Sequence, residues 1–440
     1  MNALKKRGHG ICAGSLAGVV ALALSLAACG VTGQVTGREN AVSENMVATG
    51  TERDTTGATG GVTEELESEV KKEAVTEADG NEEVKTYVAT GENESALEVS
   101  GNETVFVSDA LIRKPEGGAS SADEASFYGV NSAVRVYENG ALTLDGCSIT
   151  ADAKNATGVF AYKNGVIHLK DCEVCVTGGG AGGIQVAGGG TLTGENLTVK
   201  SASKAAIRSD RGGGFLSLDG GTYVSMGKDG CPAIYSTAEI IVRNAECVSE
   251  NSRAVIIEGK NSVTLENCTL SGNDLSSKAG SVHGNVLLYQ SASGDAAEGT
   301  STFSMTGGRI TSLSGAMFYC TNTSSMINLS NAELQLSEEE SLIIVSAGRW
   351  GKEGKNGGKC TLNAVDQVLR GSVSVDGISS LNLSLSNSSF EGSVSGDGII
   401  NVCLDEGSTW KLTGDSVVTK VSGNLDGIDL NGFALTILEK

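Results

Sequence analysis

The hexapeptide Leu144-Asp145-Gly146-Cys147-Ser148-Ile149 decides the fold, because its pattern returns along most of the chain. Each copy holds an apolar residue, a variable residue, an Asp, Asn or Gly, a small residue, a variable residue and a second apolar residue. Copies start at positions 107, 144, 169, 218, 242, 265, 305 and 329. The small position advances by 25 residues from Cys147 to Cys172 and by 23 from Ala245 to Cys268, which indicates a repeat of about 24 residues.

A repeat of this length predicts three short strands and three turns per coil of a parallel β-helix. Alternate residues of a strand face inward, and the Asp, Asn or Gly takes a turn conformation that other residues avoid. The small residue faces inward, so Cys147 and Cys172 should lie one above the other, about 4.8 Å apart per coil. A single coil buries nothing alone, and stacking makes the continuous core. We therefore expect an all-β solenoid of about a dozen coils.

A second strand recurs after each coil boundary, for example as Ala254-Val255-Ile256-Ile257 and Met317-Phe318-Tyr319. The longest interruptions of the repeat, residues 209–214, 291–300 and 346–358, all follow this second strand. Solenoid proteins carry function in loops that interrupt the repeat on one side. We expect these interruptions to stack along one edge.

Basic, polar and aromatic side chains gather near that predicted edge in a chain otherwise acidic and poor in aromatic residues. Aromatic rings stack on sugar faces, and Arg and amide groups hold hydroxyls or carboxylates. One interpretation is glycan or host-ligand binding; the other is a tyrosine ladder that stabilises the coils, with Arg and Asp pairing between turns. The candidate ligand-binding residues are Arg208, Asp210, Arg211, Tyr235, Glu258, Lys260, Tyr289, Gln290, Tyr319, Asn322, Arg349 and Trp350.

The N-terminus has the features of an exported lipoprotein. A positive start is followed by an apolar stretch over about residues 11–26, and Leu26-Ala27-Ala28-Cys29 resembles a bacterial lipobox. We expect residues 1–28 to be a lipoprotein signal peptide. Acylation of Cys29 would anchor the chain to the outer face of the cell membrane, at the cell surface.

Residues 29–94 should form a disordered acidic linker behind the anchor. Between positions 31 and 92 there are 14 Asp and Glu residues against 5 Lys and Arg, without hydrophobic periodicity. Such a stretch buries too little apolar area to offset its ordering entropy. The β-helix should then occupy residues 95–440 and end in capping coils near Trp410 and Phe433.

Composition narrows the function. The net charge of −21 argues against nucleic acid, which needs a basic face. Of the 11 cysteines, nine remain beyond Cys12 and Cys29, and we interpret most of these as small buried apolar residues. Cys172 and Cys175 lack a second pair to complete a zinc site, so neither a metal nor a cofactor is predicted.

Several motifs outside the hexapeptide resemble a known group of proteins. These are residues 126–133 (SFYGVNSA), 210–214 (DRGGG), 232–237 (PAIYST), 258–262 (EGKNS), 288–291 (LYQS) and 349–351 (RWG). They resemble uncharacterised, adhesin-like β-helix lipoproteins of Gram-positive gut bacteria, and residues 410–415 (WKLTGD) are similar to autotransporter-like passenger domains. The resemblance covers roughly residues 95–440 and implies a right-handed, pectate-lyase-like β-helix. It implies no established activity, so no catalytic residue is carried over.

We expect a surface-anchored, noncatalytic adhesin that binds a glycan or a host ligand. A polysaccharide lyase or hydrolase using the β-helix groove and a structural cell-envelope protein are the alternatives. Beyond the signal peptide the only histidines are His168 and His283, and neither lies in a Gly-His-Gly turn. Asp210 and Glu258 are the best candidates for a carboxylate pair, since their turns should align two coils apart.

Overall fold

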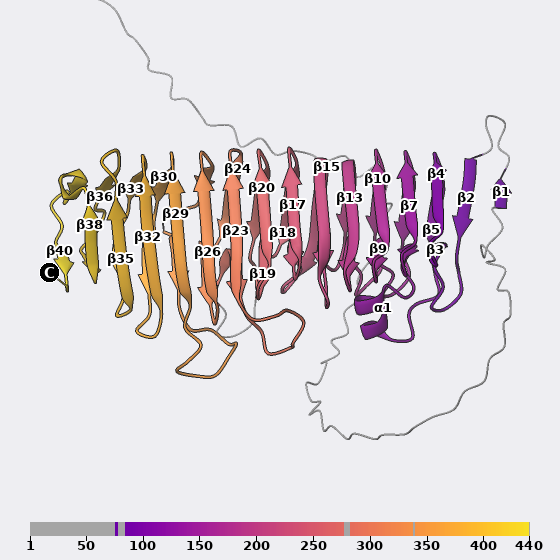
Figure 1. Ribbon diagram of the computed structural model, residues 1–440, viewed down its shortest axis with the longest axis horizontal. Helices are drawn as coiled ribbons and strands as arrows, with labels where there is room; N and C mark the ends of the chain where they lie inside the picture. Colours follow the sequence, from indigo (N-terminus) through magenta and orange to yellow (C-terminus); the bar gives the residue numbers. More distant parts are fainter. Residues whose placement is uncertain (1–74, 78–83, 277–281, 338, 440) are drawn as a thin grey trace, which may run out of the picture. The chain divides into compact units, whose positions relative to one another are not determined.

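The computed structural model of the protein describes residues 75–77, 84–276, 282–337 and 339–439. The predicted signal peptide, Cys29 and most of the predicted linker lie outside these residues. Within them, rows of parallel strands wind into a β-helix whose strands lie side by side along the solenoid axis (Figure 1). The predicted all-β solenoid is confirmed.

Two sheets contain most of the described strands. Sheet A has 22 strands and supplies one or two strands to each coil. These are β1 (Val75–Glu77), β2 (Val84–Val88), β4 (Thr104–Ser108), β5 (Leu111–Lys114), β7 (Ala141–Asp145), β8 (Ser148–Ala151), β10 (Val166–Lys170), β11 (Glu173–Val176), β13 (Gly190–Ser201), β15 (Gly214–Lys228), β17 (Glu239–Arg243), β18 (Glu246–Asn251), β20 (Ser262–Glu266), β21 (Thr269–Asn273), β23 (Thr300–Thr306), β24 (Arg309–Ser314), β26 (Ser324–Ser330), β27 (Glu333–Gln335), β29 (Lys359–Val365), β32 (Ser380–Ser386), β35 (Ile399–Leu404) and β38 (Lys420–Gly423). Sheet B has 12 strands and supplies the second recurring strand: β3 (Leu97–Val99), β6 (Val134–Val136), β9 (Val159–Tyr162), β12 (Ile184–Ala187), β14 (Ile207–Ser209), β16 (Ile234–Ser236), β19 (Val255–Glu258), β22 (Gly284–Tyr289), β25 (Ala316–Thr321), β28 (Ser341–Val345), β31 (Ser372–Val375) and β34 (Val394–Ser395).

Two short sheets complete the rows near the C-terminal end. One contains four strands: β30 (Val368–Arg370), β33 (Ser389–Glu391), β36 (Thr409–Lys411) and β39 (Ile428–Asp429). The other contains two: β37 (Ser416–Val418) and β40 (Leu435–Ile437). A 3-10 turn, η1, spans Leu425–Gly427 just before β39.

Strand register gives the repeat length directly. Leu142 pairs with Ile167, Ile167 with Leu192 and Leu192 with Leu216, which are steps of 25, 25 and 24 residues. Toward the C-terminus the coils shorten, since Leu362 pairs with Leu383, 21 residues later. The repeat of about 24 residues is therefore confirmed for the coils from β7 to β15, whereas the preceding coil, which contains the helix of residues 122–128, takes 37 residues from Val105 to Leu142.

The small positions of the hexapeptide stack inside the solenoid as predicted. Strand pairings on both sides of Cys147 and Cys172 place them in adjacent coils, and both are buried. Each thiol also donates a hydrogen bond to the carbonyl of the apolar residue that opens the hexapeptide one coil earlier. Cys172 Sγ lies 3.6 Å from the Leu144 oxygen, and Cys268 Sγ lies 3.3 Å from the Val242 oxygen. Sequence reasoning found the column but not these bonds.

The position before the small residue adopts a left-handed backbone, as the turn interpretation requires. Its φ is 50° at Asp171, 51° at Asn244 and 54° at Asn267. Asn and Asp tolerate this conformation because their short polar side chains bond locally. Asn244 Nδ2 donates to Asp219 Oδ1 at 2.7 Å, so the turns also form a polar ladder between coils.

The solenoid starts earlier than predicted. Strand β2 pairs in parallel with β5, for example Tyr87 with Ile112, so the coils already include residues before the predicted start at residue 95. The sequence did not indicate this strand because its short apolar pattern lies among acidic residues. At the other end Trp410 is fully buried and stacks on Phe390, with ring centroids 5.7 Å apart. The last coil covers it, since Trp410 pairs with Ile428.

One α-helix interrupts the described β-structure, and sequence reasoning missed it. Helix α1 spans Ala122–Tyr128 between β5 and β6. Ser121 accepts a hydrogen bond from the Glu124 amide at 3.2 Å, and Gly129 ends the helix at a φ of 71°. The signal was present, because Ser followed three residues later by Glu is the capping-box pattern.

Candidate functional site

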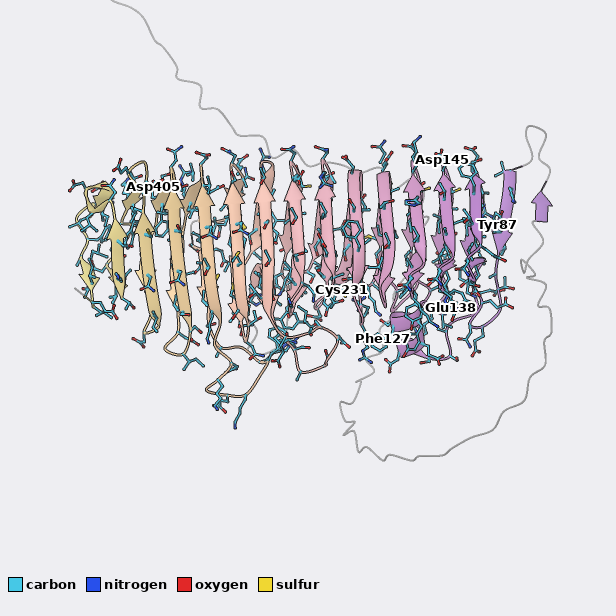
Figure 2. All side chains as sticks on the ribbon, in the orientation of Figure 1. Tyr87, Phe127, Glu138, Asp145, Cys231 and Asp405 are labelled. Carbon is cyan, nitrogen blue, oxygen red and sulfur yellow. The ribbon has the colours of Figure 1, made fainter. Side chains whose placement is uncertain are left out.

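The predicted edge exists along sheet B. The turn near residue 211 follows β14, the loop of residues 290–299 follows β22, and the loop of residues 346–358 follows β28, all three being strands of that sheet. In Figure 1 the two long loops and α1 project from the lower side. Figure 2 shows Phe127 on this side, whereas Asp145 and Asp405 lie at the opposite side.

The outer face of sheet B carries one column of side chains whose order follows the strand register. Arg208 pairs with Tyr235, Tyr235 with Ile256, Ile256 with Leu287, and Leu287 with Tyr319. Three of these side chains, from Ile256, Leu287 and Tyr319, form together with Tyr289 a hydrophobic cluster separate from the main core. The sheet therefore has apolar packing on both faces along this stretch.

A pocket of about 190 Å³ opens over this second cluster. Apolar and aromatic side chains form much of its lining, with Trp350 and Tyr289 rings 4.5 Å apart between centroids. Charged groups stand among them, and Arg349 lies 4.5 Å over the Trp350 ring. The lining residues are Asp229, Gly230, Tyr235, Arg253, Ile256, Asp274, Ser276, Leu287, Tyr289, Arg349 and Trp350.

A buried carboxylate fixes the two tyrosines of the pocket. Tyr235 and Tyr289 both donate their hydroxyl to Glu258 Oε2, at 2.6 and 2.7 Å, and Ser291 donates to Oε1. Glu258 is 1% exposed and forms no ion pair within the described residues. Burial raises the pKa of Tyr235 well above its ordinary value, and burial together with the Glu258 charge raises that of Tyr289. The phenols therefore stay protonated and bound to Glu258, which leaves their rings as the pocket lining.

Two arginines of the predicted set act as braces. Arg208 Nη2 lies 2.6 Å from Asp210 Oδ2, and its guanidinium stacks 4.7 Å over the Tyr235 ring. Arg211 Nη2 lies 2.6 Å from Asp295 Oδ1, and its guanidinium lies 4.1 Å from the Phe127 ring. Arg211 thus connects α1 to the loop of residues 290–299. Of these two ion pairs, only Arg211–Asp295 joins different turns, because Arg208 and Asp210 lie two residues apart in one coil.

Arg253 and Asp274 line the pocket and were not among the predicted residues. Arg253 Nε lies 3.1 Å from Asp274 Oδ2, and its Nη2 donates to the Val282 carbonyl at 2.7 Å. Burial lowers the pKa of Arg253 despite that partner. Both residues lie at the corner before a sheet B strand, while the prediction considered only the corner after it. The available signal was a charged residue immediately before the apolar run that starts at Ala254.

The structure divides the twelve predicted residues into groups. Those in the pocket lining are Tyr235, Tyr289, Arg349 and Trp350. Those that brace the surrounding elements without lining it are Arg208, Asp210, Arg211 and Glu258. Tyr319 is 1% exposed beneath the covering loop, and Lys260 is exposed at the turn after β19. Gln290 and Asn322 line a second hollow of about 480 Å³ between the two long loops, together with Lys352 and Lys355.

Extending the register of Arg208 with Tyr235 and of Ser236 with Ile257 by one or two residues puts Asp210, Thr237 and Glu258 at equivalent positions of three successive coils. Two coils correspond to about 9.6 Å. Each carboxylate already has its own partners, Arg208 for Asp210 and the tyrosine pair for Glu258. Among the described residues, no group of three or more His, Cys, Asp or Glu side chains is placed to hold a metal ion.

Comparison of the sequence with protein families and with curated proteins gives no match. In the part of the chain that the structure describes, no helix is long and apolar enough to span a membrane.

Proposed function

We propose that the protein is a noncatalytic glycan-binding β-helix displayed on the cell surface. The observation that supports this most strongly is the pocket on sheet B, where Trp350, Tyr235 and Tyr289 present aromatic surface beside charged side chains. Sugar rings bind to aromatic faces through their apolar C–H groups, while their hydroxyls bind charged and polar side chains. The pocket is smaller than the ~300 Å³ of typical ligand pockets, which suits a single sugar ring.

The sequence supports surface display. The charged and apolar start of the chain, followed by Ala27-Ala28-Cys29, matches export and lipidation of a new N-terminal cysteine. Mass spectrometry of the protein from a bacterial host tests this directly. We expect a diacylated Cys29 at the N-terminus, and an unmodified Cys29 in a membrane fraction would contradict the anchor.

A glycan array probed with the full chain tests the binding function. We expect the double substitution Arg349→Ala and Trp350→Ala to abolish binding, because it removes the exposed wall of the pocket. The matched control is Lys352→Ala with Lys355→Ala, which changes the same loop where it lines the second hollow. Binding that survives the first variant would place the site elsewhere, and no binding by the wild-type protein would favour a structural role in the envelope.

A further inference from the structure

We infer that the pocket recognises a carboxylate, so that its ligand is an acidic sugar. This inference rests on the proposed glycan-binding function and names the ligand class of the same site. It comes from the arginines that line the pocket, Arg253 and Arg349, and from the hydrogen bonds that one of them lacks.

Arg253 is a buried cation with an unused donor. Its side chain is 8% exposed, and that of its partner Asp274 is 2% exposed. Nε binds Asp274 and Nη2 binds the Val282 carbonyl, but Nη1 is buried and has no hydrogen-bond partner among the described residues. A guanidinium offers five N–H donors, and burial without acceptors is costly. The structure therefore leaves a charged donor beside the pocket that an incoming acceptor can satisfy.

Arg349 adds a second positive charge at the same end of the pocket. It is exposed and has no carboxylate partner within the described ranges. Burial is the largest cause of the lowered pKa of Arg253, and the nearby positive charge of Arg349 lowers this pKa further. The pocket lining also holds two aspartates. Asp274 pairs with Arg253 and lies 3.7 Å from His283, and Asp229 forms no ion pair within the described residues. A ligand carboxylate accepts paired N–H bonds from a guanidinium.

The remaining lining orients such a ligand. Trp350 and Tyr235 provide ring surface for the sugar, and Asp229, also in the lining, accepts hydroxyl hydrogens while repelling a carboxylate. Nη1 of Arg253 is shielded from solvent, so the atoms that cover it must move before a ligand can reach it. Arg349, also in the lining, is exposed. We therefore place the ligand carboxylate at the two arginines and the sugar hydroxyls toward Asp229.

The test is an array that carries uronic-acid and sialic-acid terminated oligosaccharides, each beside its carboxyl-reduced form. The reduced form keeps every hydroxyl of the sugar and carries an uncharged CH2OH group in place of the carboxylate. We expect the full chain to bind the acidic forms about tenfold or more tightly, the scale of a charge-assisted hydrogen bond. Arg253→Gln should remove this preference, whereas Arg243→Gln should keep it, since Arg243 pairs with Glu266 on sheet A.

Substitution of Arg253 leaves Asp274 buried without its cation, so Arg349→Gln serves as a second variant at an exposed position. It should reduce the preference while the protein unfolds at an unchanged temperature. Equal binding of acidic and reduced forms by the wild-type protein would overturn the carboxylate inference and leave the glycan-binding function intact. Binding of neither form would overturn both.

Discussion

Strands β19 and β20 lie in neighbouring rows of the solenoid and differ in what covers them. In β20 buried and partly exposed residues alternate, since Val263 and Leu265 face the core and the others face solvent. Every residue of β19 is buried, and so is every residue of β22 one coil later. Sheet A therefore has one covered face along this stretch, and sheet B has two.

The difference shows how a regular solenoid acquires a site. A parallel strand that is covered on both faces has a continuous apolar sequence, while a strand covered on one face alternates. Val255-Ile256-Ile257 and Val286-Leu287-Leu288 have the first pattern, and Ser262-Val263-Thr264-Leu265 has the second. The outer cover of sheet B comes from α1 and the long loops, and the pocket lies where this cover is incomplete.

The largest expected effect comes from a leucine on the outer face of each sheet. Leu287 on sheet B is 2% exposed, and Leu313 on sheet A is 63% exposed. Replacing Leu287 with Ala should lower the free energy of unfolding by about 2–4 kcal/mol, because it leaves a cavity. Replacing Leu313 with Ala should change it by less than about 0.5 kcal/mol. Denaturant unfolding of both variants measures the difference, and equal losses would show that sheet B has no second core.

A smaller effect is expected from the glutamates at the ends of β19 and β20. Glu258 accepts hydroxyls from Tyr235 and Tyr289 while buried, and Glu266 pairs with Arg243 at the surface. Glu258→Gln replaces one acceptor oxygen by a donor, which leaves a buried hydroxyl unpaired and should cost about 1–3 kcal/mol. Glu266→Gln loses an exposed ion pair worth about 0–1 kcal/mol. If the unfolding temperatures of the two variants fall by the same amount, the hydrogen bonds of Tyr235 and Tyr289 to Glu258 do not stabilise the outer side of sheet B.

The fold was predictable because one physical constraint repeats. Each turn needs a residue that accepts a positive φ, and each stacked coil needs a small inward residue, so the pattern of Asp171 and Cys172 recurs from coil to coil. Strand β2 and helix α1 were missed because each occurs without a repeat. The short apolar pattern of Tyr87 and Val88 lies among acidic residues, and α1 is marked only by Ser121, Glu124 and Gly129.

The site was only partly predictable. The sequence placed Tyr235, Tyr289 and Trp350 on one edge, because the register of a repeat orders residues along an axis. The sequence does not show how far a loop folds back over the sheet. The loop of residues 346–358 begins two coils after Tyr289 and folds back far enough to place Trp350 against it. Arg253 was missed because the prediction considered only the corner after each sheet B strand, and Arg253 lies at the corner before β19.

The smallest expected effect concerns two surface arginines. Arg211 pairs with Asp295 across the cover of sheet B, and Arg309 pairs with Glu333 on sheet A. Replacing either with Ala should cost no more than about 1 kcal/mol, because exposed ion pairs contribute little. Only Arg211→Ala should speed amide hydrogen exchange in residues 290–299, by up to about fivefold, since that loop then opens more easily. Equal exchange in both variants would mean that Arg211 does not hold the loop, and that contacts such as Ser291 with Glu258 suffice to keep the pocket wall in place.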